Sequence, residues 1–191
     1  MLKNETKIQA EKNETQQLRR DLQEGNGDDL RRRRAIIGLS LLGIGAMAAA
    51  TLFQTGIIKH LPDPPLKNFD SDAVTSSDVA YALGGADAAL SVASLAANIP
   101  AAAFGGENRF VTKPLIPIAF AAKALTEAVI ASWFFYRLAF KEKTWCAYCI
   151  VNAASIWGIG LLSLPEAKKA FNASRPFLSK GEKLREQSDA K

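Results

Sequence analysis

Two cysteines, Cys146 and Cys149, are the residues best suited to do chemistry in this 191-residue chain, which contains no others. They stand in the stretch KTWCAYCIVN, at positions 143–152. The two residues between them give the C-x-x-C spacing of sites that exchange electrons between dithiol and disulfide or that hold a metal ion. The pair therefore raises two chemical possibilities, redox exchange and metal binding.

The chain offers few further ligands for a metal. A closed structural zinc site needs four ligands, and besides the two thiolates the sequence supplies one histidine, His60, and carboxylates. Such a site would need an unusual ligand set or a second chain, so we expect no metal. We expect His60 to be solvated. A simpler alternative stays open, in which both cysteines are small apolar residues that only fill space in a helix.

The elements that must position the pair follow from hydropathy. Hydrophobic residues make up 48% of the chain, yet the mean hydropathy is close to zero, so apolar and charged residues are segregated into blocks. Apolar stretches of the roughly twenty residues that a helix needs to cross a bilayer lie at about 35–58, 79–104, 115–138 and 145–164. This pattern predicts an all-α, polytopic membrane protein, a four-transmembrane-helix bundle surrounded by lipid.

Local signals indicate where two of the spans begin or end. Ser76 and Ser77 are candidate N-caps for the second span, which Pro100 should bend or weaken. Pro165 and the polar EAKK that follows it should stop the fourth span.

Several polar residues fall inside the predicted spans, where an ionisable side chain is costly and tends to face the bundle interior. They are Asp87, Lys123, Glu127 and Asn152. Lys123 and Glu127 stand at i and i+4, so we expect an internal salt pair. Asn152 lies on the same helix face as Cys149, where it would serve either a ligand or an interhelical hydrogen bond.

Lysines and arginines predict the orientation, because they concentrate on the cytoplasmic side of a membrane. The side that carries both termini holds 18 of the 24, and the opposite side, with residues 59–78 and the start of the fourth span, holds 5. We therefore expect cytoplasmic termini and a C-x-x-C pair at the outer face of an inner or plasma membrane, where disulfides persist. The net charge of +5 then reflects topology, and no nucleic-acid partner is expected.

The two ends of the chain differ from its middle. Residues 1–34 are polar and basic, which predicts a disordered or surface-helical cytoplasmic arm, and residues 172–191 form a polar tail. The bundle itself is expected within residues 35–171, with Cys146 in the first turn of its fourth helix.

WCAYCIV at the head of the last span, together with FQTGIIKHLPDPPLKNFDSDAVTSSDVAY leaving the first, resembles the vitamin K epoxide reductase family in its compact bacterial or organellar form. The resemblance covers roughly Arg34 to Phe171. It implies a membrane thiol-disulfide oxidoreductase that passes electrons from a soluble thioredoxin-like dithiol donor, through Cys146 and Cys149, to a membrane quinone. It further implies that Cys149 faces the quinone and Cys146 the donor.

The resemblance also suggests which side chains would line a quinone site. Asn152 is placed to donate to a quinone carbonyl, and Trp145 or Tyr148 to wall the pocket. Both aromatic residues also suit the membrane interface, where we expect most of the aromatic side chains in this part of the chain.

The chain departs from the family pattern in one respect. A second cysteine pair, typical of the loop after the first span, is absent from residues 59–78. Either a soluble thioredoxin-like protein reaches Cys146 directly, or the chain is a non-catalytic membrane subunit or assembly partner that has lost the relay.

Overall fold

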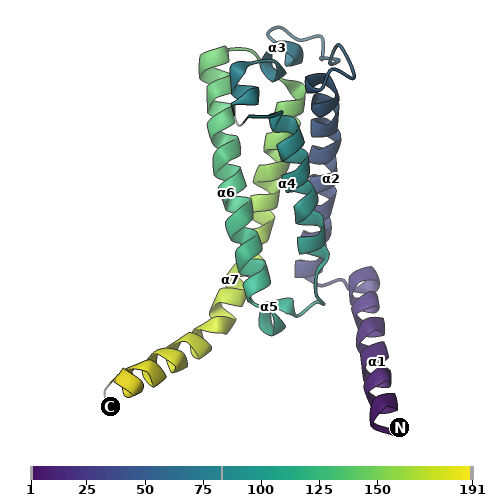
Figure 1. The fold of residues 1–191 in the computed structure, drawn as a ribbon, viewed down its shortest axis with the longest axis vertical. Helices are drawn as coiled ribbons and strands as arrows, with labels where there is room; N and C mark the ends of the chain where they lie inside the picture. Colours follow the sequence, from purple (N-terminus) through teal and green to yellow (C-terminus); the bar gives the residue numbers. More distant parts are fainter. Residues whose placement is uncertain (1, 83, 190–191) are drawn as a thin grey trace.

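The computed structural model describes residues 2–82 and 84–189, and this part of the chain is helical (Figure 1). An isolated bridge between Phe69 and Trp145 is its only β-type pairing. The longer helices are α1 (Leu2–Glu24), α2 (Asp28–Gln54), α4 (Asp87–Ala103), α6 (Leu115–Arg137) and α7 (Ala147–Asp189). The short ones are α3 (Ser71–Thr75), the 3-10 helix η1 (Asp78–Tyr81), α5 (Arg109–Thr112) and the π-helix η2 (Leu138–Glu142). The predicted all-α fold is confirmed.

Helices α2, α4, α6 and α7 form the bundle (Figure 1). Helix α2 packs against α4 and α7, and α6 packs against α7, whereas α4 and α6 contact each other only sparsely. Helix α2 approaches its neighbours closely at Gly43, where an added Cβ would lie 2.8 Å from Leu95 Cδ1 and 3.4 Å from Ser155 Cβ. The core contains Ile36, Leu95, Phe120, Ala124 and Ile159.

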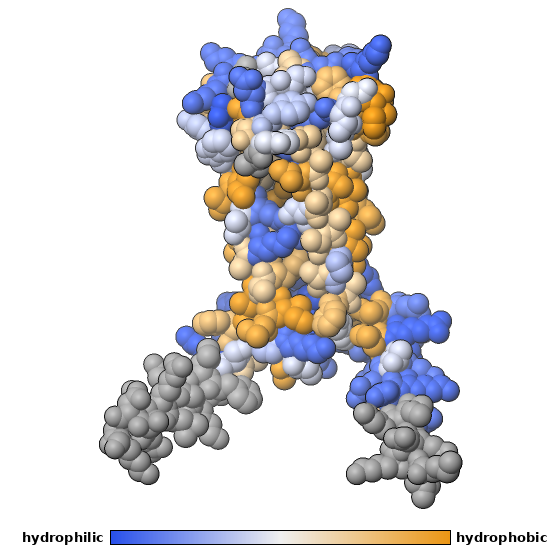
Figure 2. Space-filling model, viewed as in Figure 1, coloured by the Kyte–Doolittle hydropathy of each residue, from blue (hydrophilic) through white to orange (hydrophobic). Residues whose placement is uncertain are grey.

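Helices α2, α6 and α7 are long and apolar enough to cross a membrane. Helix α4 has 17 residues, which makes it about 25 Å long at 1.5 Å per residue, and it is also apolar. On the face seen in Figure 2, most of the bundle surface between the more hydrophilic ends is apolar, with a smaller hydrophilic patch at mid-height. The chain is therefore a multi-pass integral membrane protein built as a helical bundle.

Two spans have ends that differ from those expected. Helix α4 begins at Asp87 rather than near residue 79, because Gly84 has a φ of +80°, which a continuous right-handed helix does not allow. Ser77 therefore precedes η1 without a capping side-chain hydrogen bond, and Ser76 ends α3. Helix α2 starts earlier than expected, at Asp28, and ends at Gln54, shortly before Gly56 with its φ of +76°.

Pro165 does not end the helix that contains the fourth predicted span, since α7 continues to Asp189. A proline removes one backbone hydrogen bond from a helix interior, but the next residue ties this turn to the bundle. Glu166 accepts from Arg109 Nε at 2.7 Å and Nη2 at 2.8 Å, and its Oε1 lies 2.9 Å from Arg33 Nη2. All three side chains are buried. We call them the basal ion cluster (Arg33, Arg109 and Glu166).

The start of α1 and the end of α7 lie at the end of the bundle opposite α3 (Figure 1). The basic arm is helical as α1. Residue 1 of that arm, residue 83 of the expected second span, and residues 190–191 of the tail lie outside the described residues.

Candidate active site

Cys146 and Cys149 are joined as a disulfide at the start of α7, with Cα atoms 5.2 Å apart. Cys146 precedes the first residue of the helix instead of lying in its first turn, and its carbonyl accepts from Ile150 N at 3.1 Å. Its Sγ lies 3.1 Å from Cys149 N. Cys146 therefore holds the N-cap position, where a side-chain acceptor meets an otherwise unpaired amide.

A segment that we call the capping loop (residues 59–78) covers Cys146, whose exposed fraction is 0%. Trp145 N donates to Asn68 O at 2.7 Å, and Asp70 N donates back to Trp145 O at 3.0 Å. On the other side of the cysteine, Ala147 N donates to Ser71 Oγ at 3.2 Å. These hydrogen bonds bracket Cys146, so the loop is fixed to the helix start directly around the sulfur.

Two carboxylates accept hydrogen bonds within the capping loop. Asp63 accepts from Ser71 N at 2.7 Å and from its Oγ at 2.5 Å. Asp72 accepts from Leu61 N at 2.8 Å and lies 2.5 Å from His60 Nδ1. The hydrogen bond to Asp72 raises the pKa of His60, and the charge of the same carboxylate acts in the same direction. His60 is solvent-exposed, as expected.

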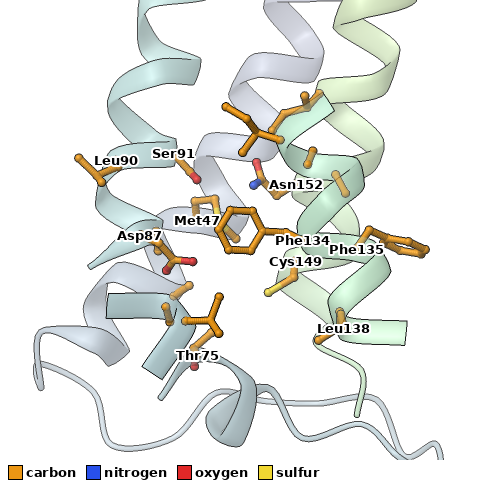
Figure 3. Close-up of a pocket in the computed structure, with 18 of the residues that line it drawn as sticks. Met47, Thr75, Asp87, Leu90, Ser91, Phe134, Phe135, Leu138, Cys149 and Asn152 are labelled. Carbon is orange, nitrogen blue, oxygen red and sulfur yellow. The ribbon is translucent and has the colours of Figure 1, made fainter. Parts of the chain in front are cut away.

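Cys149 lines a cavity of about 290 Å³ between the helices. Met47 comes from α2, Asp87 from α4 and Phe134 from α6, and all three side chains project toward the space beside the Cys149 sulfur (Figure 3). Most of the remaining lining is apolar. Because α4 and α6 barely touch, the cavity occupies the part of the bundle where two neighbouring helices are least packed together.

Asn152 lines the same cavity one turn deeper than Cys149 (Figure 3). Its Oδ1 is buried and has no hydrogen-bond partner among the described residues. A buried amide oxygen without a partner is costly, and here it lies beside a cavity. A ligand that can donate a hydrogen bond would remove that cost.

Trp145 and Tyr148 lie outside the wall of this cavity. The Trp145 ring packs against Phe135 with centroids 5.8 Å apart. Tyr148 donates from its hydroxyl to Pro62 O at 3.0 Å and lines a separate, shallower hollow. Of the three residues suggested for ligand contact, the structure thus brings only Asn152 together with Cys149.

Two further polar groups lie outside the cavity lining and contact carboxylates that belong to it. Gln54, which hydropathy alone gives no reason to select, donates to Asp87 Oδ1 at 2.8 Å. Glu127 lines the cavity, and Lys123 Nζ lies 2.6 Å from its Oε1, so the predicted salt pair is confirmed. The same ammonium donates to Asn98 Oδ1 at 2.7 Å, and Ser94 Oγ donates to Glu127. The α4 partners were not predicted, because helical spacing relates residues of one helix only.

Comparison with known proteins adds one finding. Residues 34–164 match the model of the vitamin K epoxide reductase family. No curated protein matches the chain. The matched segment contains most of α2, all of α4 and α6, the capping loop, both cysteines and the cavity.

Proposed function

The chain belongs to the vitamin K epoxide reductase family, and from that premise we propose that it oxidises a dithiol donor at Cys146–Cys149 and passes the electrons to a membrane quinone. The coarser assignment, a membrane protein of the thiol-disulfide oxidoreductase type, follows from the family and from the helical bundle. The observation that carries the finer proposal is that Cys149 borders an apolar cavity inside the bundle.

The two sulfurs have different surroundings, which assigns a direction to the exchange. A donor thiolate attacks the sulfur of Cys146, forming a mixed disulfide and releasing Cys149 as a thiolate. The second donor thiol then displaces Cys146, so the donor is oxidised and the pair is reduced by two electrons. Cys149 faces the cavity, so it is the sulfur placed to hand these electrons to the quinone.

The cavity suits a quinone in size and polarity. Ligand pockets are mostly apolar with few polar groups, and this one is roughly as large as the smaller of them. The Asn152 amide offers an N–H donor for a quinone carbonyl and a free oxygen acceptor for the hydroxyl of the hydroquinone. Asn152 would thus bind both the quinone and the hydroquinone next to Cys149.

Without a loop cysteine pair, the donor must reach Cys146 itself. That sulfur is fully buried beneath the capping loop, so the loop must move before a donor sulfur can approach in line. A small dithiol can enter when the loop opens by itself. We propose a folded thioredoxin-like donor, which can also bind the displaced loop, acting at the outer face of an inner or plasma membrane.

Thiol labelling tests the proposal. The purified protein is reduced with dithiothreitol, desalted and mixed with decylubiquinone, whose ring positions are all substituted, so that a thiol does not simply add to the ring. We expect both thiols to disappear with the formation of one hydroquinone per protein, and dithiothreitol to restore them. A protein with both cysteines replaced by serine is the control.

A second candidate function is a non-catalytic membrane subunit. The burial of Cys146 and the absence of any other cysteine favour it. Two thiols that remain alkylatable after quinone addition, in a correctly folded protein, would replace the enzyme with this subunit.

A further inference from the structure

Asp87 is an acidic side chain at the same end of the cavity as the redox-active sulfur. It is the first residue of α4 and lies across the cavity from Cys149, which comes from the start of α7 (Figure 3). The carboxyl group is half-buried, and ionisable groups inside a bundle are rarely without a function. The proposed mechanism has not used it.

Gln54 fixes the orientation of this carboxyl group. Its Nε2 donates to Asp87 Oδ1 at 2.8 Å and to Thr75 O at 3.1 Å, while its Oε1 accepts from Ala88 N at 3.2 Å. The side-chain amide of Gln54, at the end of α2, therefore links the start of α4 to the end of α3. An acid that transfers a proton must be held within hydrogen-bonding reach of its acceptor, and this arrangement provides a fixed carboxyl group.

We propose that Asp87 is the general acid that protonates a quinone oxygen when the Cys146–Cys149 dithiol is oxidised, a role that rests on the proposed function. Oxidation of the two thiols forms the S–S bond and releases two electrons and two protons. The quinone takes up both electrons and two protons and becomes the hydroquinone. The carboxyl O–H of Asp87 supplies one of these protons, and a proton from the thiols restores it. The second thiol proton and the proton for the other quinone oxygen exchange with solvent.

The other charged groups of the cavity lining come from α6. Glu127 lies deeper, and its carboxylate is engaged by Lys123 and Ser94. Arg137, at the end of α6, contacts the face of the Trp133 ring. The cavity residues contributed by α2, α3 and η1 are uncharged. Asp87 is thus the acid that shares the outer end of the cavity with Cys149 and is not committed to an ion pair with Lys123.

The test measures the quinone half-reaction alone. Full-length protein, reduced and desalted, is mixed rapidly with decylubiquinone over a range of pH. For Asp87→Asn we expect hydroquinone formation to slow by about 100- to 10,000-fold, the usual contribution of general acid catalysis, and the wild-type dependence on pH to be lost. Asp87→Glu should restore most of the rate with a shifted pH profile. Asp28→Asn, an exposed aspartate that is the first residue of α2, should behave as wild type.

Two readouts besides turnover separate chemistry from structure. Quinone binding, followed by quenching of tryptophan fluorescence, should be nearly unchanged in Asp87→Asn. The infrared difference spectrum on quinone binding should contain a protonated-carboxyl band that Asp87→Asn removes and Asp87→Glu moves. A merely structural role would weaken binding and leave the pH profile of the residual activity unchanged.

The outcomes are distinguishable. A wild-type protein that binds decylubiquinone but does not reduce it overturns the proposed function and this inference with it. A wild-type protein that reduces the quinone, together with an Asp87→Asn variant of unchanged rate and pH profile, overturns the role of Asp87 alone. If Asp87→Asn does not fold, the Asp87→Glu spectrum decides, because an unmoved carboxyl band rules out Asp87.

Discussion

Cys146 and Cys149 are three residues apart, yet their sulfur atoms lie in different surroundings. Cys146 is enclosed by the capping loop and its sulfur accepts from the amide of Cys149. This helix N–H group and the positive end of the helix dipole favour the thiolate form of Cys146. Cys149 points into the cavity (Figure 3). The single turn between them therefore separates a sulfur covered by the loop from a sulfur that faces the cavity.

This difference predicts distinct fates for the two single-cysteine variants. In Cys149→Ser, the remaining sulfur is first linked to thionitrobenzoate and then exposed to a thioredoxin-fold domain that lacks its second cysteine. We expect the domain to displace thionitrobenzoate and remain bound to Cys146, because no resolving thiol is present. The matched Cys146→Ser variant should form little complex, since Cys149 faces the cavity. Mass spectrometry and thionitrobenzoate absorbance follow the reaction, and equal yields would contradict the assigned roles.

Residue spacing predicts which side chains lie together when both belong to one helix. It does not predict contacts between side chains of different helices. Cys149 and Asn152 lie on one face of α7, so their spacing brings them together in advance. Gln54 reaches Asp87 from another helix, through hydrogen bonds at the ends of α2 and α4. Trp145 and Tyr148, adjacent to the cysteines in sequence, turn toward the aromatic residues and the capping loop instead of the cavity.

Among the elements, the capping loop controls access to the disulfide. Beyond the hydrogen bonds around Cys146, it is held to the first turn of α7 by the Tyr148 hydroxyl, which donates to Pro62 O. A reductant reaches the buried sulfur only from the open form of the loop. The population of that form should therefore set the rate of reduction by a small thiol.

Removing the Tyr148 hydroxyl should loosen this closure. One hydrogen bond contributes about 0.5–1.5 kcal/mol, so Tyr148→Phe should raise the open population, and the rate of disulfide reduction by dithiothreitol, by about 2- to 10-fold. The matched control is Tyr136→Phe, whose ring is exposed on α6. Rates are measured by quenched alkylation. An unchanged rate for Tyr148→Phe would show that the loop does not limit access.

Helix α7 shows why sequence signals place the elements better than their ends. Hydropathy located the four helices of the bundle, but Pro165 and the polar residues after it do not end the fourth helix. The buried position of Glu166 depends on Arg33 and Arg109, which lie far away in sequence. A charge that looks like the end of a membrane helix is here satisfied by tertiary contacts, which no local signal reports.

The basal ion cluster should therefore be important for stability. Glu166→Gln leaves two buried arginines without their carboxylate, and breaking a buried ion pair costs about 3–5 kcal/mol. We expect a decrease of that order in the free energy of unfolding, measured by denaturant titration in detergent. Glu107→Gln lies in the neighbouring loop, where Arg33 uses the backbone carbonyl and not the side chain. This control should stay within about 0.5 kcal/mol of wild type.

For the molecule as a whole, the structure gives the bundle two different ends. One end carries the capping loop and the disulfide, and the other carries α5, the basal ion cluster and the chain ends (Figure 1). The 18 to 5 distribution of lysine and arginine follows this division, since most of the basic residues lie with the chain ends. Charge and fold thus agree on which parts lie at the same end of the bundle, and the positive-inside rule predicts the direction.

Single cysteines at the two ends test that direction in a protein with Cys146 and Cys149 replaced by serine. Leu66, in the capping loop, and Val111, in α5, are both apolar and exposed, at 62% and 59%, so each substitution leaves the charge distribution unchanged. We expect Leu66→Cys to react with a membrane-impermeant maleimide in intact cells. The end of the bundle that carries Leu66 has few of the basic residues that keep a segment on the cytoplasmic side. Val111→Cys should react only after permeabilisation. The reverse pattern would place the disulfide in the reducing compartment, where it would not persist, and the outer-face donor proposed for this chain would be wrong.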